Sequence, residues 1–108
     1  MPLPAITFLQ WLVLEIIGGS TRSGKYVRDR LAERGHRKSL PAFYQMMSRL
    51  EDAGFVRAES VRATVCDQTV TERHYRLMGK GIRELADVRD FQAGLEIARS
   101  QGRQVSHG

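Results

Sequence analysis

The chain has 108 residues, of which 42% are hydrophobic and 27% charged, and its formal net charge at pH 7 is +5. This length gives one domain with a core too small to hold a deep enzyme cleft comfortably, and the composition is that of a globular rather than a disordered or membrane protein. The one cysteine, Cys66, excludes an intramolecular disulfide, and with the three histidines it does not follow the ligand spacing of a zinc site. We therefore expect neither a metal site nor a cofactor.

The first apolar run, residues 6–17, bears on the location of the protein. It contains Gln10 and Glu15 and is too short to cross a bilayer. It shows neither the basic leader nor the small-residue cleavage site of a secretory signal peptide. We expect a cytoplasmic protein that does not bind a membrane.

The same run predicts a helix over residues 5–17, ended by two glycines. Its apolar side chains form two stripes, which are Ile6, Leu9, Val13 and Ile16 on one side and Phe8, Trp11 and Leu12 on the other. A helix that is apolar on all sides needs to be buried on all sides, and a small monomer cannot easily provide that. The helix therefore predicts a subunit interface; the alternative is that Trp11 covers the core of a monomer.

Residues 22–38 carry the whole positive excess of the chain. Seven basic residues occur there with two acidic ones, namely Arg22, Lys25, Arg28, Arg30, Arg34, Arg37 and Lys38 with Asp29 and Glu33. Within this segment, GKYVRDRLAERG predicts a second helix after Ser23, with Tyr26 or Val27 and Leu31 inward. Its basic face can hold the backbone of a polyanion, although a solvated charged helix is the usual explanation of such a run.

Residues 39–54, SLPAFYQMMSRLEDAG, predict a third helix that is capped by Ser39 and ended by Gly54. Its inward side is expected to consist of Leu40, Phe43, Met46, Met47 and Leu50. Its outward side is hydrogen-bonding and mostly uncharged, and such a surface can approach the edge of a base closely. Because only about four residues join the two helices, they predict a helix-turn-helix. The alternative is an ordinary core helix with a solvated back.

After Gly54 the hydrophobic period changes to two, which predicts strands over residues 55–64 and 70–77. The turn is expected around residues 66–69, without a strong two-residue hairpin signal. Tyr75 and Leu77 are expected to point inward, and His74 and Arg76 outward. With its arginines, the hairpin would be a basic wing.

A last helix is predicted from residue 79 or 80 to about residue 101. Its apolar residues form a thin stripe, which is typical of a seam between helices and again favours a dimer: Ile82, Leu85, Val88, Phe91, Leu95 and Ala98. Residues 102–108 have little to bury, and we expect them to fray.

Three blocks, GKYVRDRLAERG, LPAFYQMMSRLEDAGFV and ERHYRLMGKG, resemble the PadR-type winged-helix transcriptional regulators in that order. The resemblance extends over roughly residues 6–90. It implies an α+β, mostly α fold: a winged helix-turn-helix domain with a two-stranded wing over residues 1–78, a C-terminal dimerisation helix over 79–101 and a disordered tail over 102–108. The sequence departs from the family at Met78, where a threonine usually begins the final helix.

The resemblance also implies a homodimer that binds double-stranded DNA at a palindromic operator, as a sequence-specific regulator of the repressor type. The base-reading residues are expected to be Ser39, Ala42, Tyr44, Gln45, Ser48 and Arg49. Phosphates are expected to bind Lys25, Arg28, Arg37 and Lys38, and, on the wing, Arg62 and Arg73. The expected dimer interface consists of Phe8, Trp11, Leu12, Leu85, Val88, Phe91 and Leu95, and a small aromatic effector could bind among its rings.

Two other classes of function stay open. The basic surface could bind an acidic protein partner, since a fold does not determine a function. An enzyme is the weakest alternative, because the sequence offers no nucleophile with a base, no paired carboxylates and no phosphate-binding glycine loop.

Overall fold

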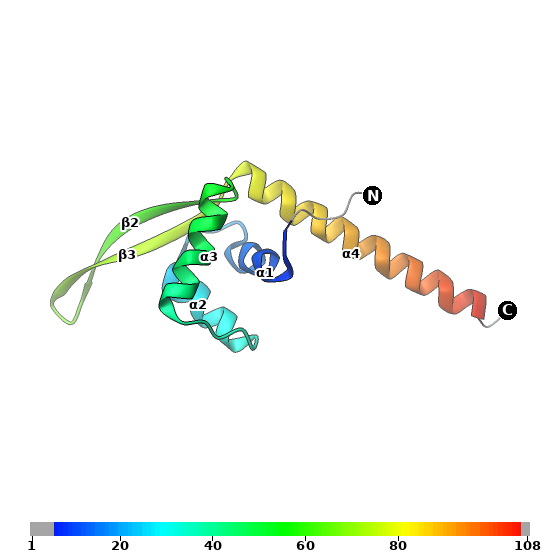
Figure 1. Cartoon of the computed structure of the whole chain (residues 1–108), viewed down its shortest axis with the longest axis horizontal. Coiled ribbons are helices and arrows are strands. Elements are labelled where there is room, and N and C mark those ends of the chain that lie inside the picture. Colours follow the sequence, from blue (N-terminus) through cyan, green and yellow to red (C-terminus); the bar gives the residue numbers. More distant parts are fainter. Residues whose placement is uncertain (1–5, 107–108) are drawn as a thin grey trace.

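The computed structural model describes residues 6–106, which form a group of three helices with a hairpin on one side and a long helix on the other (Figure 1). The elements follow in the order α1 (Phe8–Ile17), β1 (Arg22–Ser23), α2 (Gly24–Glu33), α3 (Leu40–Asp52), β2 (Val56–Val65), β3 (Gln68–Leu77) and α4 (Gly79–Ser106). The strands form one antiparallel sheet in the order β1-β3-β2. The α+β winged-helix class is confirmed, with β1 as an additional strand that the sequence did not predict.

A capping box at Thr7 sets the start of α1 at Phe8. The Thr7 hydroxyl accepts a hydrogen bond from the Gln10 amide at 3.1 Å, and the Gln10 side chain accepts one from the Thr7 amide at 3.0 Å. These two bonds satisfy amide groups that the helix itself leaves without acceptors. The helix thus begins later than predicted, because Ile6 and Thr7 precede it; the predicted first residue, residue 5, lies outside the described residues.

The two helices of the helix-turn-helix end in the same way. Gly35 and Gly54 adopt the left-handed conformation, with φ of +86° and +82°, directly after the capping residue of each helix. The following amide then donates back to the last turn, from His36 to the Leu31 carbonyl at 2.8 Å and from Phe55 to the Leu50 carbonyl at 3.0 Å. The connection between the helices is residues 34–39, which is longer than predicted.

The core lies between α1, α2, α3 and the base of the sheet. Its largest fully buried side chains are Tyr75, Phe43, Leu14, Ile17, Leu31, Met47, Leu50, Val13 and Val27. Val27 rather than Tyr26 is therefore the inward residue of α2. The prediction was wrong for Leu40, whose side chain is 47% exposed because it lies in the first turn of α3, ahead of the part that packs on the core.

The wing is longer and its turn tighter than the sequence indicated. β2 and β3 pair from Val56 opposite Leu77 out to Val65 opposite Gln68, which leaves a two-residue turn of Cys66 and Asp67. Both turn residues have positive φ, of 52° and 63°, as in the twisted turns that suit antiparallel hairpins. Such turns usually contain asparagine and glycine. Because Cys66 and Asp67 are neither, the sequence contained no clear signal for this turn.

Replacing Asp67 by glycine is expected to raise the free energy of unfolding by about 1 kcal/mol, because the left-handed conformation costs a residue with a Cβ atom about this much. Denaturant titration followed by circular dichroism measures the change. Gln68→Gly, at an extended strand position, is the matched control and is expected to destabilise instead. Equal effects of the two substitutions would contradict the turn geometry.

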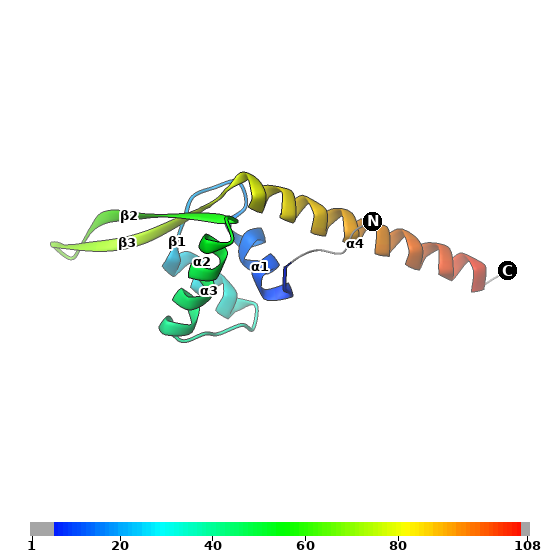
Figure 2. The same cartoon turned by 45° about the horizontal axis from the view of Figure 1, so that its top comes forward.

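α4 begins directly after Met78 and continues to Ser106, beyond the predicted end at Gln101. The predicted frayed segment is thus helical over residues 102–106, and residues 107–108 lie outside the described part. The first half of α4 packs on the domain through the buried Leu85 and Val88, whereas the second half leads away from it (Figures 1 and 2). In the part of the chain that the structure describes, no helix has the length and apolar character needed to span a membrane.

Candidate nucleic-acid interface

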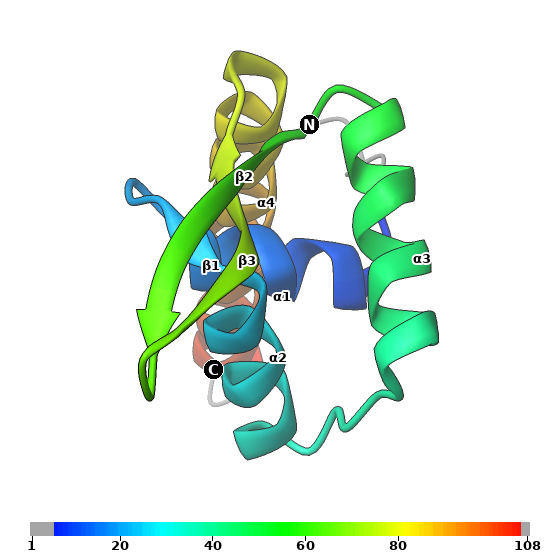
Figure 3. The same cartoon turned by 90° about the vertical axis from the view of Figure 1, so that its left-hand side faces the viewer.

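The outward side of α3 is open along the edge of the domain (Figure 3). Phe43, Met47 and Leu50 anchor the opposite side in the core. Four of the predicted base-reading residues are exposed along this outward side, namely Tyr44, Gln45, Ser48 and Arg49. The exposed side therefore combines a phenol, an amide, a hydroxyl and one guanidinium, all of which can form hydrogen bonds.

The two other predicted base-reading residues have different surroundings. The Ser39 hydroxyl accepts a hydrogen bond from the Ala42 amide at 3.3 Å and so caps the start of α3, as its sequence position indicated. Ala42 is half-buried and lines a hollow between α1 and α3 together with Gln45 and Arg49. Both residues therefore help to set the start and the packing of the helix.

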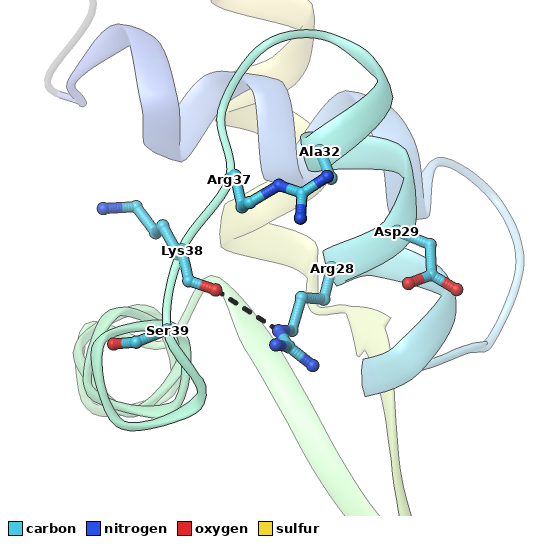
Figure 4. A pocket seen from close by; sticks show the side chains of 6 residues that line it. All are labelled: Arg28, Asp29, Ala32, Arg37, Lys38 and Ser39. Atoms are coloured by element: carbon cyan, nitrogen blue, oxygen red, sulfur yellow. Dashed lines mark hydrogen bonds between the residues drawn. The ribbon is translucent and has the colours of Figure 1, made fainter.

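A basic hollow lies between α2 and the start of α3 (Figure 4). It has a volume of about 400 Å³ and is lined by Arg28, Asp29, Ala32, Arg37, Lys38 and Ser39. The guanidinium groups of Arg28 and Arg37 point into it, whereas the Lys38 ammonium group points away (Figure 4). Two guanidinium groups beside the N-terminus of a helix favour a bound anion such as a phosphate group.

Arg28 also holds the connection between the two helices. Its Nε donates to the Lys38 carbonyl at 3.3 Å, and its side chain is half-buried. This bond fixes the residue directly before the cap of α3, so Arg28 has a structural role in addition to its charge. Lys25 lies further out and pairs with Asp29 at 3.1 Å, with its side chain 83% exposed. Such an exposed pair is weak and leaves the ammonium group available to another anion.

The two predicted wing cations lie on one side of the hairpin. Ser60 pairs with Arg73 and Arg62 with Thr71, and directly opposite residues of an antiparallel pair share a face. This face continues into a groove toward α3, lined by Tyr44, Ser48, Ser60, Thr71, Arg73 and Tyr75. Arg62 and Arg73 are therefore on the side of the wing that faces the outward residues of α3.

The sequence analysis missed the partner of Arg73, which is Glu51 on α3. The Arg73 guanidinium donates to the two Glu51 carboxylate oxygens at 3.1 and 3.4 Å, and this hydrogen bonding raises the pKa of Arg73 above its ordinary value. Burial raises the pKa of the neighbouring Tyr75, which lines the same groove between α3 and the wing. The 22 residues that separate Arg73 from Glu51 leave no local signal of this contact in the sequence.

A second, apolar hollow lies between the start of α1 and the middle of α4. It is lined by Ile6, Thr7, Phe8, Trp11, Val88, Phe91, Gln92 and Leu95. The rings of Phe8 and Trp11 lie 5.4 Å apart, and Phe8 is 63% exposed. Three residues of the predicted interface, Leu12, Leu85 and Val88, are at least nine-tenths buried in the chain's own fold, which narrows the surface left for a partner.

Among the residues that the structure describes, no group of three or more histidine, cysteine, aspartate or glutamate side chains could hold a metal ion. Cys66 is exposed at the tip of the wing.

No protein-family model matches the chain, and no curated protein matches it. Solved structures, in contrast, match the chain in fold. A PadR-like transcription factor from Bacteroides fragilis superposes with a TM-score of 0.71 at 18% identity, over 86% of this chain and 87% of the other. A PadR family transcription regulator from Clostridium difficile R20291 gives 0.71 at 14% identity, over 88% and 97%. Bacillus subtilis PadR in complex with operator DNA gives 0.62 at 20% identity, over 75% of this chain and 46% of the other. The fold is that of the PadR-type regulators, as the sequence resemblance implied.

Proposed function

We propose that this chain, which has the fold of the PadR-type regulators, is a sequence-specific DNA-binding transcriptional regulator that represses from a palindromic operator as a homodimer. The observation that carries the proposal is the outward side of α3. It is polar and mostly uncharged, and cations border it on the α2 side and on the wing. Hydrogen-bonding groups can select bases, while the bordering cations can hold phosphates on either side.

The width of α3 allows it to enter the major groove of DNA. A helix with its side chains is about 10–12 Å wide, and the major groove of B-DNA is about 12 Å wide. Tyr44, Gln45 and Ser48 lie on the exposed side, where they can meet base edges. The Bacillus subtilis PadR complex shows that a protein of the same fold binds operator DNA.

A homodimer is supported by the apolar hollow between α1 and α4. Phe8 and Leu95 are largely exposed there, with Trp11 and Phe91 half-buried beside them. Large aromatic side chains are typical of interface centres, and a two-fold dimer presents the same patch on both subunits. Two copies of α3 would then read two half-sites related by the same symmetry, which is the reason to expect a palindrome.

The proposal is tested by selecting bound sequences from a random duplex library with the purified chain and footprinting the selected site. A repeatedly selected sequence with inverted symmetry, protected as two half-sites, is the expected result. A reporter gene placed behind that site should be expressed less when the chain is present. Binding without any sequence preference would instead favour a basic module for an acidic protein partner.

Gln45→Ala and Arg37→Ala are expected to weaken DNA binding in different ways. A side-chain amide that pairs with a base contributes about 1–3 kcal/mol of discrimination, so Gln45→Ala should reduce binding to the selected site while leaving random DNA unaffected. Arg37→Ala should weaken binding to the selected duplex and to a random duplex by the same factor. It should also lower the slope of log Kd against log salt concentration by about one, because each phosphate contact releases counterions.

Fluorescence anisotropy with the two duplexes at several salt concentrations measures these effects. Arg34→Ala is a matched control for Arg37→Ala, since Arg34 is exposed at the end of α2 but does not line the basic hollow. Unchanged binding in both the Gln45 and the Arg37 variants would contradict the assignment of the two surfaces.

A further inference from the structure

Phe55 joins the end of α3 to the start of α4. Its amide donates to the Leu50 carbonyl at 3.0 Å, and its carbonyl accepts from the Met78 amide at 2.9 Å. The Lys80 ammonium group lies 4.8 Å from the centre of the Phe55 ring and donates to the Ala53 carbonyl at 2.8 Å. The end of α3, the proposed recognition helix, and the start of α4 are therefore held against the same short segment, residues 53–55.

Gly81 is the point of closest approach between α4 and this segment. A methyl group added at Gly81 would lie 2.2 Å from the Phe55 carbonyl oxygen and 3.1 Å from its carbonyl carbon. A relaxed carbon-to-oxygen contact is about 3.3 Å, so α4 would have to move by about 1 Å. The Phe55 carbonyl cannot easily retreat, because it accepts the bond from Met78.

A second contact holds α4 against α1. The Arg89 guanidinium donates to both carboxylate oxygens of Glu15 at 3.2 Å. Arg89 lies eight positions after Gly81, or about 12 Å further along the helix at 1.5 Å per residue. Together with the buried Leu85 and Val88 between them, these two contacts set the direction in which α4 leaves the domain.

We propose that Gly81 and the Glu15–Arg89 pair set the spacing of the two operator half-sites, by fixing the angle between α4 and the recognition helix. The inference rests on the proposed function, in which α4 takes part in the dimer. If α4 moves by about 1 Å at Gly81 and stays in place at Arg89, about 12 Å further along the helix, it tilts by about 5° in each subunit. We take the distance from the dimer axis to each recognition helix as about 17 Å, which is half of the distance between two half-sites one DNA turn apart. Over this distance the two tilts move the recognition helices by about 3 Å relative to each other, which is close to the rise of one base pair.

The experiment uses duplexes in which the selected half-sites are separated by spacers that differ in steps of one base pair. The wild-type dimer is expected to show one optimal spacer. Gly81→Ala should shift that optimum by about one base pair, or lower affinity at the wild-type spacer about tenfold, while light scattering still shows a dimer. Gly79→Ala is the matched control, because its methyl group would contact only the flexible end of Arg83 at 3.3 Å, and it should keep the wild-type profile.

Arg89→Gln provides an independent variant in case Gly81→Ala does not fold. Without the charged pair α4 keeps its contacts at Gly81 and through the buried Leu85 and Val88, but loses the contact beyond them. The preference for the optimal spacer over its neighbours should therefore fall about threefold or more. Arg99→Gln is its control, since Arg99 pairs with Glu96 within α4 at 3.4 Å and cannot affect the angle to α1.

The outcomes separate this inference from the proposed function. A wild-type chain without any spacer optimum would count against the proposed function itself. A wild-type optimum that persists unchanged in Arg89→Gln, and in a folded, dimeric Gly81→Ala, would overturn the inference alone.

Discussion

A chain carrying Leu95→Glu is expected to be a monomer at concentrations where the wild-type chain is expected to form the proposed dimer, and to bind a two-half-site operator about 10²–10⁴-fold more weakly. Leu95 is 48% exposed and lines the apolar hollow between α1 and α4. A carboxylate there would have to lose its hydration for the interface to form, which is costly without a partner. The monomer should stay folded, because Leu95 lies outside the core.

Light scattering and anisotropy with the selected operator measure the two effects. Ile97→Glu is the matched control: Ile97 is 60% exposed, two positions further along the same helix, and therefore points about 200° away from Leu95. It is expected to remain a dimer with unchanged operator affinity. If Leu95→Glu stays dimeric, or if both variants lose affinity equally, the proposed interface is wrong.

Phe43→Ala is expected to lower the free energy of unfolding by about 3–5 kcal/mol. Phe43 is 1% exposed and is one of three side chains that anchor α3 in the core. Removing its ring leaves a cavity directly under the proposed base-reading surface. Since small domains are stable by only about 5–15 kcal/mol, this loss removes a large part of the total stability and should abolish operator binding near 37 °C.

The neighbouring substitution, Tyr44→Ala, separates the fold from the function of α3. Tyr44 is 44% exposed, so its removal should cost less than about 1 kcal/mol of stability. Operator binding should nevertheless weaken, because Tyr44 lies on the outward side and lines the groove toward the wing. Thermal unfolding and anisotropy on the same preparations distinguish the two variants. A Tyr44→Ala chain as unstable as Phe43→Ala would show that Tyr44 is mainly structural.

Several features of the fold were readable from the sequence because they depend on neighbouring residues. Ser39 at the start of α3 and the glycines at positions 35 and 54 act within one helical turn, and the structure uses all three as predicted. The spacing of Phe43, Met47 and Leu50 likewise identified the buried side of α3. The same spacing identified the opposite, outward side of α3, which carries Tyr44, Gln45, Ser48 and Arg49.

Other features could not be predicted because they join distant parts of the chain. Glu51 meets Arg73 and Glu15 meets Arg89 across 22 and 74 residues, and the sequence of either partner alone gives no sign of the other. The strand β1 exists only because residues 22–23 pair with β3. The turn at Cys66 and Asp67 lacks the usual asparagine and glycine, and the register of the strands forms it nevertheless.

The sequence by itself determined which residues cap the helices of the helix-turn-helix, which side of α3 is buried, and that a basic segment precedes it. Only the tertiary structure decided that Arg73 is paired rather than free, that Leu12 and Leu85 belong to the core, and that α4 rests on Phe55 through Gly81. The reason is physical: caps and amphipathic spacing act over one or two helical turns, whereas charge pairing and close backbone contact depend on the arrangement of whole elements in space.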